Sequence, residues 1–168
     1  MRANEALAVQ GERCRLVPYR AHHVPAYHAW MQDAAMLAAT ASEPLTLEEE
    51  YRMCESWRAD EDKCTFIVEV DGEPVGDVNL FLNDPDDSTA AEIEVMVAVA
   101  SARRRGVASE ALTTLQAWAA GALGLRRFVA KIGHANAPSL ALFRRLGYAL
   151  VSSSAVFEEV RALASGLR

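Results

Sequence analysis

The chain has 168 residues, of which 51% are hydrophobic and 24% are charged, a composition typical of globular domains. No apolar stretch reaches the roughly 20 residues that a membrane-spanning helix needs, and the first residues do not form a secretory signal. Seventeen basic against 23 acidic residues give a net charge of −6, which argues against general attraction to nucleic acid or to anionic membranes.

The cysteines and the absence of linkers limit the possible compartment and domain organisation of the chain. Cys14, Cys54 and Cys64 are odd in number and widely spaced, so they predict neither a disulfide framework nor a zinc site, and favour a reducing, cytoplasmic location. The histidines have no metal-ligand spacing either, and we predict no metal. With no repeat or Pro/Gly/Ser-rich linker in the sequence, we expect a flexible leader over residues 1–10 and a single domain over 11–168.

The first half of the chain predicts a helical stretch followed by a meander of strands. Thr46 and Glu49 have the spacing of a capping box, and Asp71-Gly72 suits a tight hairpin turn. The expected elements are a strand at 15–17, one or two helices across 22–36, a helix from 46 to about 57, and strands at 64–70, 75–82 and 91–99.

The second half alternates helices with strands. Apolar residues recur at helical spacing between 108 and 118, and they predict a helix that ends near Gly121 or Gly124. A strand at 126–132, a helix at 138–146 and strand candidates at 148–151 and 156–163 follow, although the last segment is equally compatible with a helix. This order predicts an α/β protein (α+β) with a mixed, mostly antiparallel twisted sheet of about seven strands and helices on both faces.

Two carboxylates alternate with apolar residues in the strand at 91–99. Because successive side chains of a strand point to opposite faces, Glu92 and Glu94 should share one face while Ile93 lies on the other. Such a pair can share a proton, which raises one pKa toward neutrality and suits a general base. The alternative is two carboxylates on a solvated face.

The segment from Arg103 to Ala108, Arg-Arg-Arg-Gly-Val-Ala, joins this strand to the next helix. Free N–H groups at a helix start carry partial positive charge, and the small residues let a ligand approach the backbone. Three arginines in an acidic protein add further affinity for phosphate. The alternative is a solvated basic turn. The pattern fits neither of the common nucleotide-binding loops.

This Arg-x-x-Gly-x-Ala pattern resembles the pyrophosphate loop of the GNAT (GCN5-related N-acetyltransferase) superfamily. The following strand, Asn136-Ala137-Pro138-Ser139, Phe143 and Leu146-Gly147-Tyr148 agree with that pattern. Four segments further resemble its N-acetyltransferase 9-like branch: TASEPLTLEEEY (40–51), SWRADEDKCTFIVEV (56–70), VGDVNLFL (75–82) and AEIEVMV (91–97). The resemblance covers residues 11 to 161 and implies a GNAT fold, acetyl-CoA as cofactor and N-acetyltransferase activity.

The resemblance also implies roles for individual residues. Glu92 becomes the first candidate for the general base and Glu94 the second. The tyrosine that protonates the leaving thiolate in many relatives is replaced by Phe143, which has no proton to give, so the general acid is left unassigned. Asn136 suits a helix N-terminus whether or not it also contacts cofactor. The implied cofactor-binding residues are Met96, Val97 and Ala98 along the pantetheine arm, Arg103, Arg104, Arg105, Gly106, Val107, Ala108 and Ser109 around the pyrophosphate, and Asn136, Ser139 and Phe143 near the thioester.

The sequence predicts the amine that accepts the acetyl group less precisely than it predicts the acetyl donor. We expect a protein N-terminus or a lysine in preference to a small molecule, and a lysine, with its pKa near 10.4, needs a general base most. His28, Trp30 and Asn79 are candidate substrate-binding residues. The alternative function is a catalytically weak or inactive scaffold that acts as a binding protein, with tubulin or microtubules as the partner that the resemblance implies.

Overall fold

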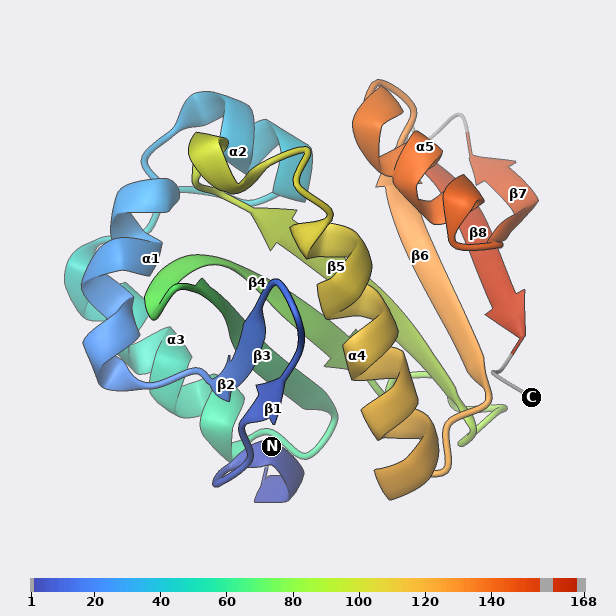
Figure 1. Ribbon diagram of the computed structural model, residues 1–168, viewed down its shortest axis with the longest axis horizontal. Helices are drawn as coiled ribbons and strands as arrows, with labels where there is room; N and C mark the ends of the chain where they lie inside the picture. Colours follow the sequence, from blue (N-terminus) through green and yellow to red (C-terminus); the bar gives the residue numbers. More distant parts are fainter. Residues whose placement is uncertain (1, 155–158, 166–168) are drawn as a thin grey trace.

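A computed structural model describes residues 2–154 and 159–165, and its centre is one twisted sheet (Figure 1). The sheet has eight strands in the order β1-β2-β3-β4-β5-β6-β8-β7. Only β5 and β6 pair in parallel, and the other neighbours are antiparallel. The predicted mixed, mostly antiparallel sheet is therefore confirmed, with eight strands where about seven were expected.

The extra strand comes from the expected leader. Residues 2–10 form a short 3₁₀ helix at Arg2–Asn4 and strand β1 at Val9–Gln10, which pairs with β2 at Arg15–Pro18. Asn4 is buried, and its Nδ2 donates a hydrogen bond of 2.8 Å to Thr65 O in the sheet. The expectation of a flexible leader is thus wrong for residues 2–10, because a hairpin and a buried amide attach them to the sheet.

Three helices cover one face of the sheet: α1 at Val24–Trp30, α2 at Ala34–Thr40 and α3 at Leu47–Ala59. Thr46 and Glu49 form the predicted capping box at the start of α3. The expected helical stretch at 22–36 divides at Asp33, whose carboxylate caps α2 by accepting from Ala35 and Met36 N–H. A buried cluster that includes Ile67 and Met96 packs this layer onto the sheet.

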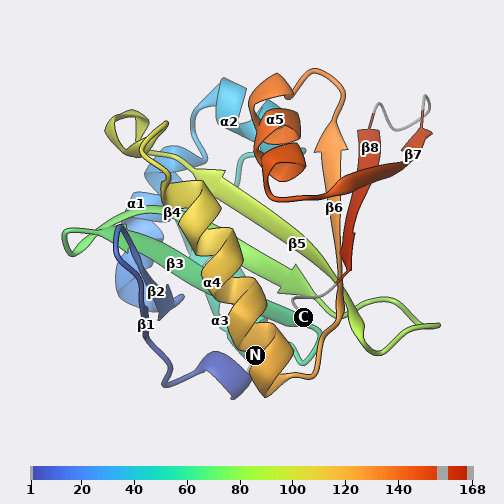
Figure 2. The same cartoon turned by 45° about the vertical axis from the view of Figure 1, so that its right-hand side comes forward.

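The middle of the sheet is a meander of β3 at Lys63–Val70, β4 at Glu73–Phe81 and β5 at Ala90–Val97. Asp71 and Gly72 have φ of 54° and 84°, so the predicted hairpin turn is present. Figure 2 shows α4, Val107–Ala122, crossing these strands on the face opposite α3. Helix α5, Ala137–Arg145, belongs to the same packed layer, since Phe143 shares a core cluster with Leu112 of α4.

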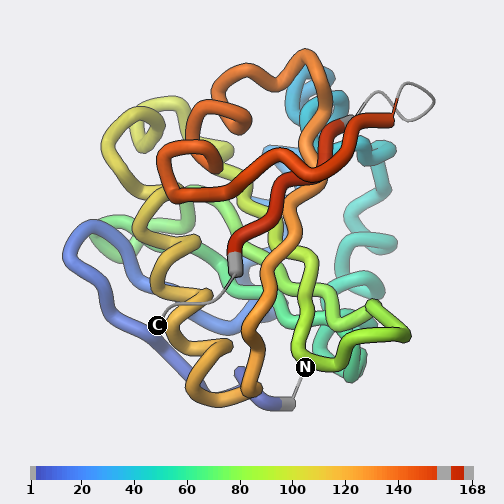
Figure 3. The backbone as a smooth tube through the Cα atoms, turned by 90° about the vertical axis from the view of Figure 1, so that its right-hand side faces the viewer, coloured from blue at the N-terminus to red at the C-terminus, as the bar shows by residue number. Residues whose placement is uncertain are grey.

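The last strands lie beside β6, Arg127–Gly133. The chain after α5 forms β7 at Ala149–Ser154 and then β8 at Glu159–Ser165, which inserts between β6 and β7 (Figure 3). The strand candidate at 156–163 is a strand from Glu159 on, while residues 156–158 lie outside the described part of the chain.

Strands β5 and β6 separate partway along their length. Their parallel pairing covers Ala90 to Glu92 against Arg127 to Val129, yet β5 continues to Val97 and β6 to Gly133. The two arrows diverge in Figures 1 and 2. We call this opening between the two strands the split.

Candidate active site

A groove with a volume of about 900 Å³ runs along the split. It receives side chains from both helical layers: Tyr27 of α1 and Met31 directly after that helix on one side, and Ser139 and Phe143 of α5 on the other. Between them lie Glu92 to Met96 of β5 and Lys131 to Asn136 at the end of β6. The groove therefore gives a ligand on one face of the sheet access to a ligand on the other.

The β5 backbone facing the split has polar groups without a strand partner. Ala98 N–H donates to Val75 O of β4 at 2.8 Å, and because antiparallel hydrogen bonding alternates, Met96 also turns its backbone toward β4. The N–H and C=O groups of Val95 and Val97 accordingly face the split. A ligand with amides of its own can extend the sheet at this edge.

Arg103 has a structural contact that the sequence did not indicate. Its Nε donates to Val97 O at 2.8 Å and its Nη2 to Ala98 O at 2.9 Å, while its own N–H donates to Ala100 O. The guanidinium thus fixes the end of β5. Of the expected cofactor-binding groups, the Arg103 amide, the Val97 carbonyl and the Ala98 backbone already have partners in the fold.

The loop after Arg103 ends in an open helix start. Arg104 and Gly106 have φ of 60° and 83°, and Arg104 and Arg105 are exposed. The first backbone hydrogen bond of α4 runs from Glu110 N–H to Gly106 O, so the amides of residues 107–109 precede the helix ladder. This donor set suits a pyrophosphate. The loop lies beyond the groove lining, past the end of β5.

Helix α5 supplies the other wall of the split. Asn136 Oδ1 accepts a hydrogen bond from Ser139 N–H at 3.2 Å and caps the helix, which is the structural role expected for it. Phe143 is buried edge-to-face against Tyr148, with ring centroids 4.9 Å apart. The Tyr148 hydroxyl accepts from Gln116 Nε2 at 2.5 Å, and burial raises its pKa, so Tyr148 retains its proton.

Glu92 and Glu94 occupy different environments. The Glu92 Oε2 lies 2.6 Å from the Nζ of Lys131 on β6, so Glu92 is an ion-paired carboxylate. Glu94 has no such partner within 4 Å among the described residues. Although Glu94 is exposed to the groove, desolvation by the walls, and then the charges of Glu92 and Asp77, raise its pKa to about 7. Glu94 thus has the pKa of a general base at neutral pH.

A buried polar network supports Glu94 from the neighbouring strands. Asn79 lies directly across from Glu94 in the β4–β5 register, and its Nδ2 donates to Asp77 Oδ2 at 3.0 Å. The same oxygen accepts from the Tyr27 hydroxyl at 3.1 Å, and Thr65 Oγ1 donates to Asn79 Oδ1 at 2.6 Å. Burial raises the pKa of Asp77. The network places further acidic and amide groups in the groove.

Lys63 completes this face of the sheet. It is 8% exposed, and its Nζ lies 3.3 Å from the Trp57 ring centroid and 4.4 Å from that of Phe81. Burial lowers its pKa to about 8, against the opposing influence of Asp77, Glu94 and Asp60. The acceptor side of the groove therefore combines aromatic rings, carboxylates and one buried ammonium.

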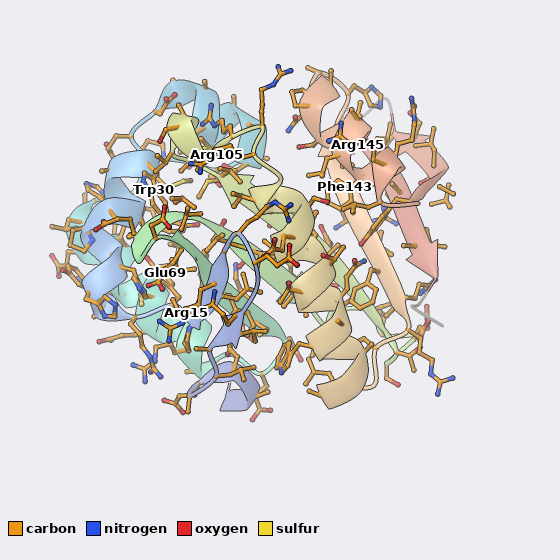
Figure 4. The ribbon with its side chains drawn as sticks, viewed as in Figure 1. Arg15, Trp30, Glu69, Arg105, Phe143 and Arg145 are labelled. Carbon is orange, nitrogen blue, oxygen red and sulfur yellow. The ribbon has the colours of Figure 1, made fainter. Side chains whose placement is uncertain are left out.

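Of the three predicted substrate-binding residues, one lines the groove and two do not. Asn79 lines the groove, whereas His28 and Trp30 lie outside the groove lining. His28 Nδ1 is 3.4 Å from Gln32 Nε2, and Trp30 packs on Tyr27 with ring centroids 5.8 Å apart. Figure 4 shows Trp30 on α1, well away from Phe143 on α5.

Sequence reasoning missed both lysines of the groove. The chain contains two lysines, Lys63 and Lys131, so that the remaining 15 of its 17 basic residues are arginines. Both lysines line the groove. The available signal was the scarcity of lysine. In a chain that otherwise uses arginine for its positive charge, a lysine indicates a position where an ammonium has a particular role.

The described residues contain neither a metal-binding cluster nor a membrane-spanning helix. In residues 2–154 and 159–165, no group of three or more His, Cys, Asp or Glu side chains is arranged to hold a metal ion. Within the same part of the chain, no helix has the length and apolar character that crossing a membrane requires.

The chain is similar to known proteins in both sequence and structure. The profile of the family described as "Acetyltransferase (GNAT) domain" matches residues 13–149. An "N-acetyltransferase 9-like protein" of Nematostella vectensis is 48% identical over 95% of this chain and 86% of its own length. The human "Alpha/beta-tubulin-N-acetyltransferase 9" is 46% identical over 95% of this chain and 84% of its own length.

Solved structures share the fold at low identity. RimL, a ribosomal alpha-N-protein acetyltransferase, superposes with a TM-score of 0.83 at 19% identity, over 95% of this chain and 94% of its own. A structure of RimL in complex with coenzyme A superposes with a TM-score of 0.79 at 18% identity, over 95% of this chain and 98% of its own.

Proposed function

Because the chain belongs to the GNAT acetyltransferase family, and within it to the N-acetyltransferase 9-like group, we propose that its groove is the site where acetyl-CoA meets a protein amine. The enzyme is an acetyl-CoA-dependent N-acetyltransferase. The observation that carries the assignment of the site is Glu94, a carboxylate with a pKa of about 7, in a groove that follows the split.

The donor side of the site consists mainly of backbone. The amides of residues 107–109 and the positive φ of Gly106 suit the pyrophosphate of the cofactor, and Arg104 and Arg105 add positive charge. The β5 edge at Val95 and Val97 suits the amides of the pantetheine arm. Ser139 and Phe143 form the wall beside the reacting end of the cofactor. When bound, acetyl-CoA supplies an activated acetyl thioester there.

The acceptor side removes a proton from the amine. In our proposal Glu94 takes that role, because its pKa is about 7, whereas the Glu92 carboxylate is occupied by the Lys131 ammonium. The order of the two sequence-based candidates is therefore reversed. Phe143 and Tyr148 do not provide the general acid, so the proton that Glu94 accepts returns to the leaving sulfur directly or through water.

The acceptor we propose is a protein N-terminus. An α-amino group with pKa near 8 is neutral about one time in ten at pH 7, and so needs less help from a base than a lysine. The human relative is named as an alpha/beta-tubulin acetyltransferase, and we extend tubulin to this chain as a proposed substrate. The free thiols of its three cysteines support a cytoplasmic location.

Turnover on defined peptides tests this function. Purified protein is incubated with acetyl-CoA and two sets of peptides, one with a free N-terminus and one N-blocked with an internal lysine. We expect release of CoA and a mass gain of one acetyl group in the free N-terminus set. Without turnover on any peptide, and with acetyl-CoA bound, the inactive scaffold would be the better account.

A further inference from the structure

The ammonium of Lys63 lacks a hydrogen-bonding partner of its own. The residue as a whole is more than nine-tenths buried and its side chain lines the groove, and within residues 2–154 and 159–165 its Nζ has no hydrogen-bond acceptor and no carboxylate within 4 Å. Its close contacts are the faces of Trp57 and Phe81. A lysine ammonium has three donors, and burying it without acceptors is unfavourable. A ligand that brings an acceptor would relieve that cost.

The other lysine of the chain provides an internal comparison. Lys131 lines the same groove but forms an ion pair of 2.6 Å with Glu92. Both lysines thus line one groove, and Lys63 differs from Lys131 in having no carboxylate partner within 4 Å among the described residues. Since both ammonium groups border the space in which an acceptor must lie, an acidic group of the acceptor is a suitable partner for Lys63.

We propose that Lys63 binds an acidic side chain of the acceptor, so that the enzyme selects protein N-termini that carry such a residue near the acetylated amine. This inference rests on the proposed function. A charge-assisted hydrogen bond between ammonium and carboxylate is about twice as strong as a neutral one. Trp57 and Phe81 hold the lysine in place, which reduces the entropy lost when the acceptor binds.

The spacing of the strands sets the position of the acidic residue. Lys63 of β3 pairs with Phe81 of β4, which in turn pairs with Glu92 of β5, so Lys63 lies two strands over and two residues along from Glu94. Two steps between neighbouring strands amount to about 10 Å and two residues along a strand to about 7 Å, a diagonal of about 12 Å that equals about three to four residues of an extended chain. With the acceptor amine at Glu94, the acidic side chain belongs at about the third residue of the acceptor.

The experiment compares two peptides that differ only in having Glu or Gln at the third residue. Their dissociation constants are measured by calorimetry with CoA present, for the wild type, Lys63→Met and Lys63→Arg. We expect the wild type to bind the Glu peptide about tenfold more tightly. Lys63→Met should lose this preference through weaker binding of the Glu peptide, and Lys63→Arg, which keeps the charge, should retain most of it.

Equal dissociation constants for the two peptides in the wild type would overturn the proposal, as would an unchanged preference in Lys63→Met. If Lys63→Met does not fold, Glu94→Gln is measured at pH 7 and pH 9.5, because in the wild type Glu94, with a pKa of about 7, itself gains charge over this range. The carboxylates of Asp60 and Asp77 also face Lys63. The preference should fall at the higher pH, where Lys63, with a pKa of about 8, is neutral; a constant preference contradicts the role of Lys63.

This measurement is separate from the test of the proposed function, because peptide binding does not require turnover. Acetylation of both peptides with equal affinity would leave the function in place and remove the role of Lys63. Selective binding of the Glu peptide without acetylation would do the reverse.

Discussion

Lys131 Nζ and Glu92 Oε2 lie 2.6 Å apart at the point where β5 and β6 cease to pair. This ion pair distinguishes the two neighbouring carboxylates of β5. Glu92 has a lysine partner, whereas Glu94 has none among the described residues, and desolvation, followed by the charges of Glu92 and Asp77, raises the pKa of Glu94 to about 7.

Replacing Glu94 by Gln should lower the acetylation rate by on the order of 10²–10⁴, the range for loss of a general base, with little change in acetyl-CoA affinity. The matched control is Glu92→Gln, which removes a carboxylate from the same face but leaves the base, and should cost less than about tenfold. Steady-state kinetics on one N-terminal peptide measures both. A larger loss in Glu92→Gln than in Glu94→Gln would return the base to Glu92.

The pH dependence of kcat/KM should contain two ionisations. Glu94 acts when deprotonated and its pKa is about 7, and an α-amino acceptor reacts when neutral, with pKa near 8. The logarithm of kcat/KM should therefore rise with a slope of about 2 below pH 7 and about 1 between pH 7 and 8. Glu94→Gln should show a slope of about 1 throughout; a wild-type slope of 1 below pH 7 would rule out Glu94.

Gly106→Val should abolish CoA binding while the domain stays folded. Gly106 has φ of 83°, and an added Cβ would lie 3.3 Å from Arg13 Cδ, so a β-branched residue strains the helix start and obstructs the phosphate. Gly124→Val, at the far end of α4 with φ of 70° and open space around it, is the matched control: similar backbone strain with normal CoA affinity. Calorimetric titration with CoA distinguishes them, and tight binding by folded Gly106→Val would contradict the loop assignment.

Acetyl-CoA should raise the melting temperature. A ligand at about 100 times its dissociation constant adds roughly 2.7 kcal/mol to the folded state, which for a domain of this size corresponds to a shift of roughly 5–10 °C. CoA should give a comparable shift, since few of the proposed contacts involve the acetyl group. Thermal unfolding followed by circular dichroism measures this, and a folded protein unmoved by millimolar CoA would lack the site.

His23 should make the fold sensitive to mild acid. Burial, followed by the charges of His22 and Arg20, lowers its pKa to about 4, so the folded state favours the neutral ring. The contribution is complete above pH 6.5 and is lost as the pH falls toward 4, by on the order of 3 kcal/mol. His23→Asn, which keeps an acceptor for Arg20 N–H, should lose less stability over this range in urea unfolding. An equal loss in both proteins would exclude His23.

The sequence predicted the elements well where a local signal defined them. The capping box at Thr46, the hairpin turn at Asp71-Gly72 and the pair of carboxylates on one face of β5 are all properties of short segments, and all are present in the structure. The expected flexible leader was wrong for residues 2–10 because the buried Asn4 side chain donates a hydrogen bond to Thr65 O, a contact across 61 residues that no local pattern reports.

The chemistry of the site depended on register more than on pattern. Glu92 pairs with Val129, and the same register continued would bring Lys131 level with Glu94. The strands part beyond that pair, and the Lys131 ammonium instead lies 2.6 Å from Glu92, which the sequence leaves open. Arg103 looked like a phosphate ligand by its position in the loop, yet its guanidinium binds the carbonyls of Val97 and Ala98. Residue type predicted charge in both cases, and the partner came from the tertiary fold.

The split in the sheet also affects how the molecule holds together. Strands β6, β8 and β7 are joined to the rest of the sheet through three residue pairs of β5 and β6, whereas β3 and β4 pair along almost their full length. The two parts of the sheet are therefore held together by a short hydrogen-bonded ladder beside the groove. We expect the two parts to open as separate cooperative units in hydrogen exchange, with any ligand that spans the split coupling their motions.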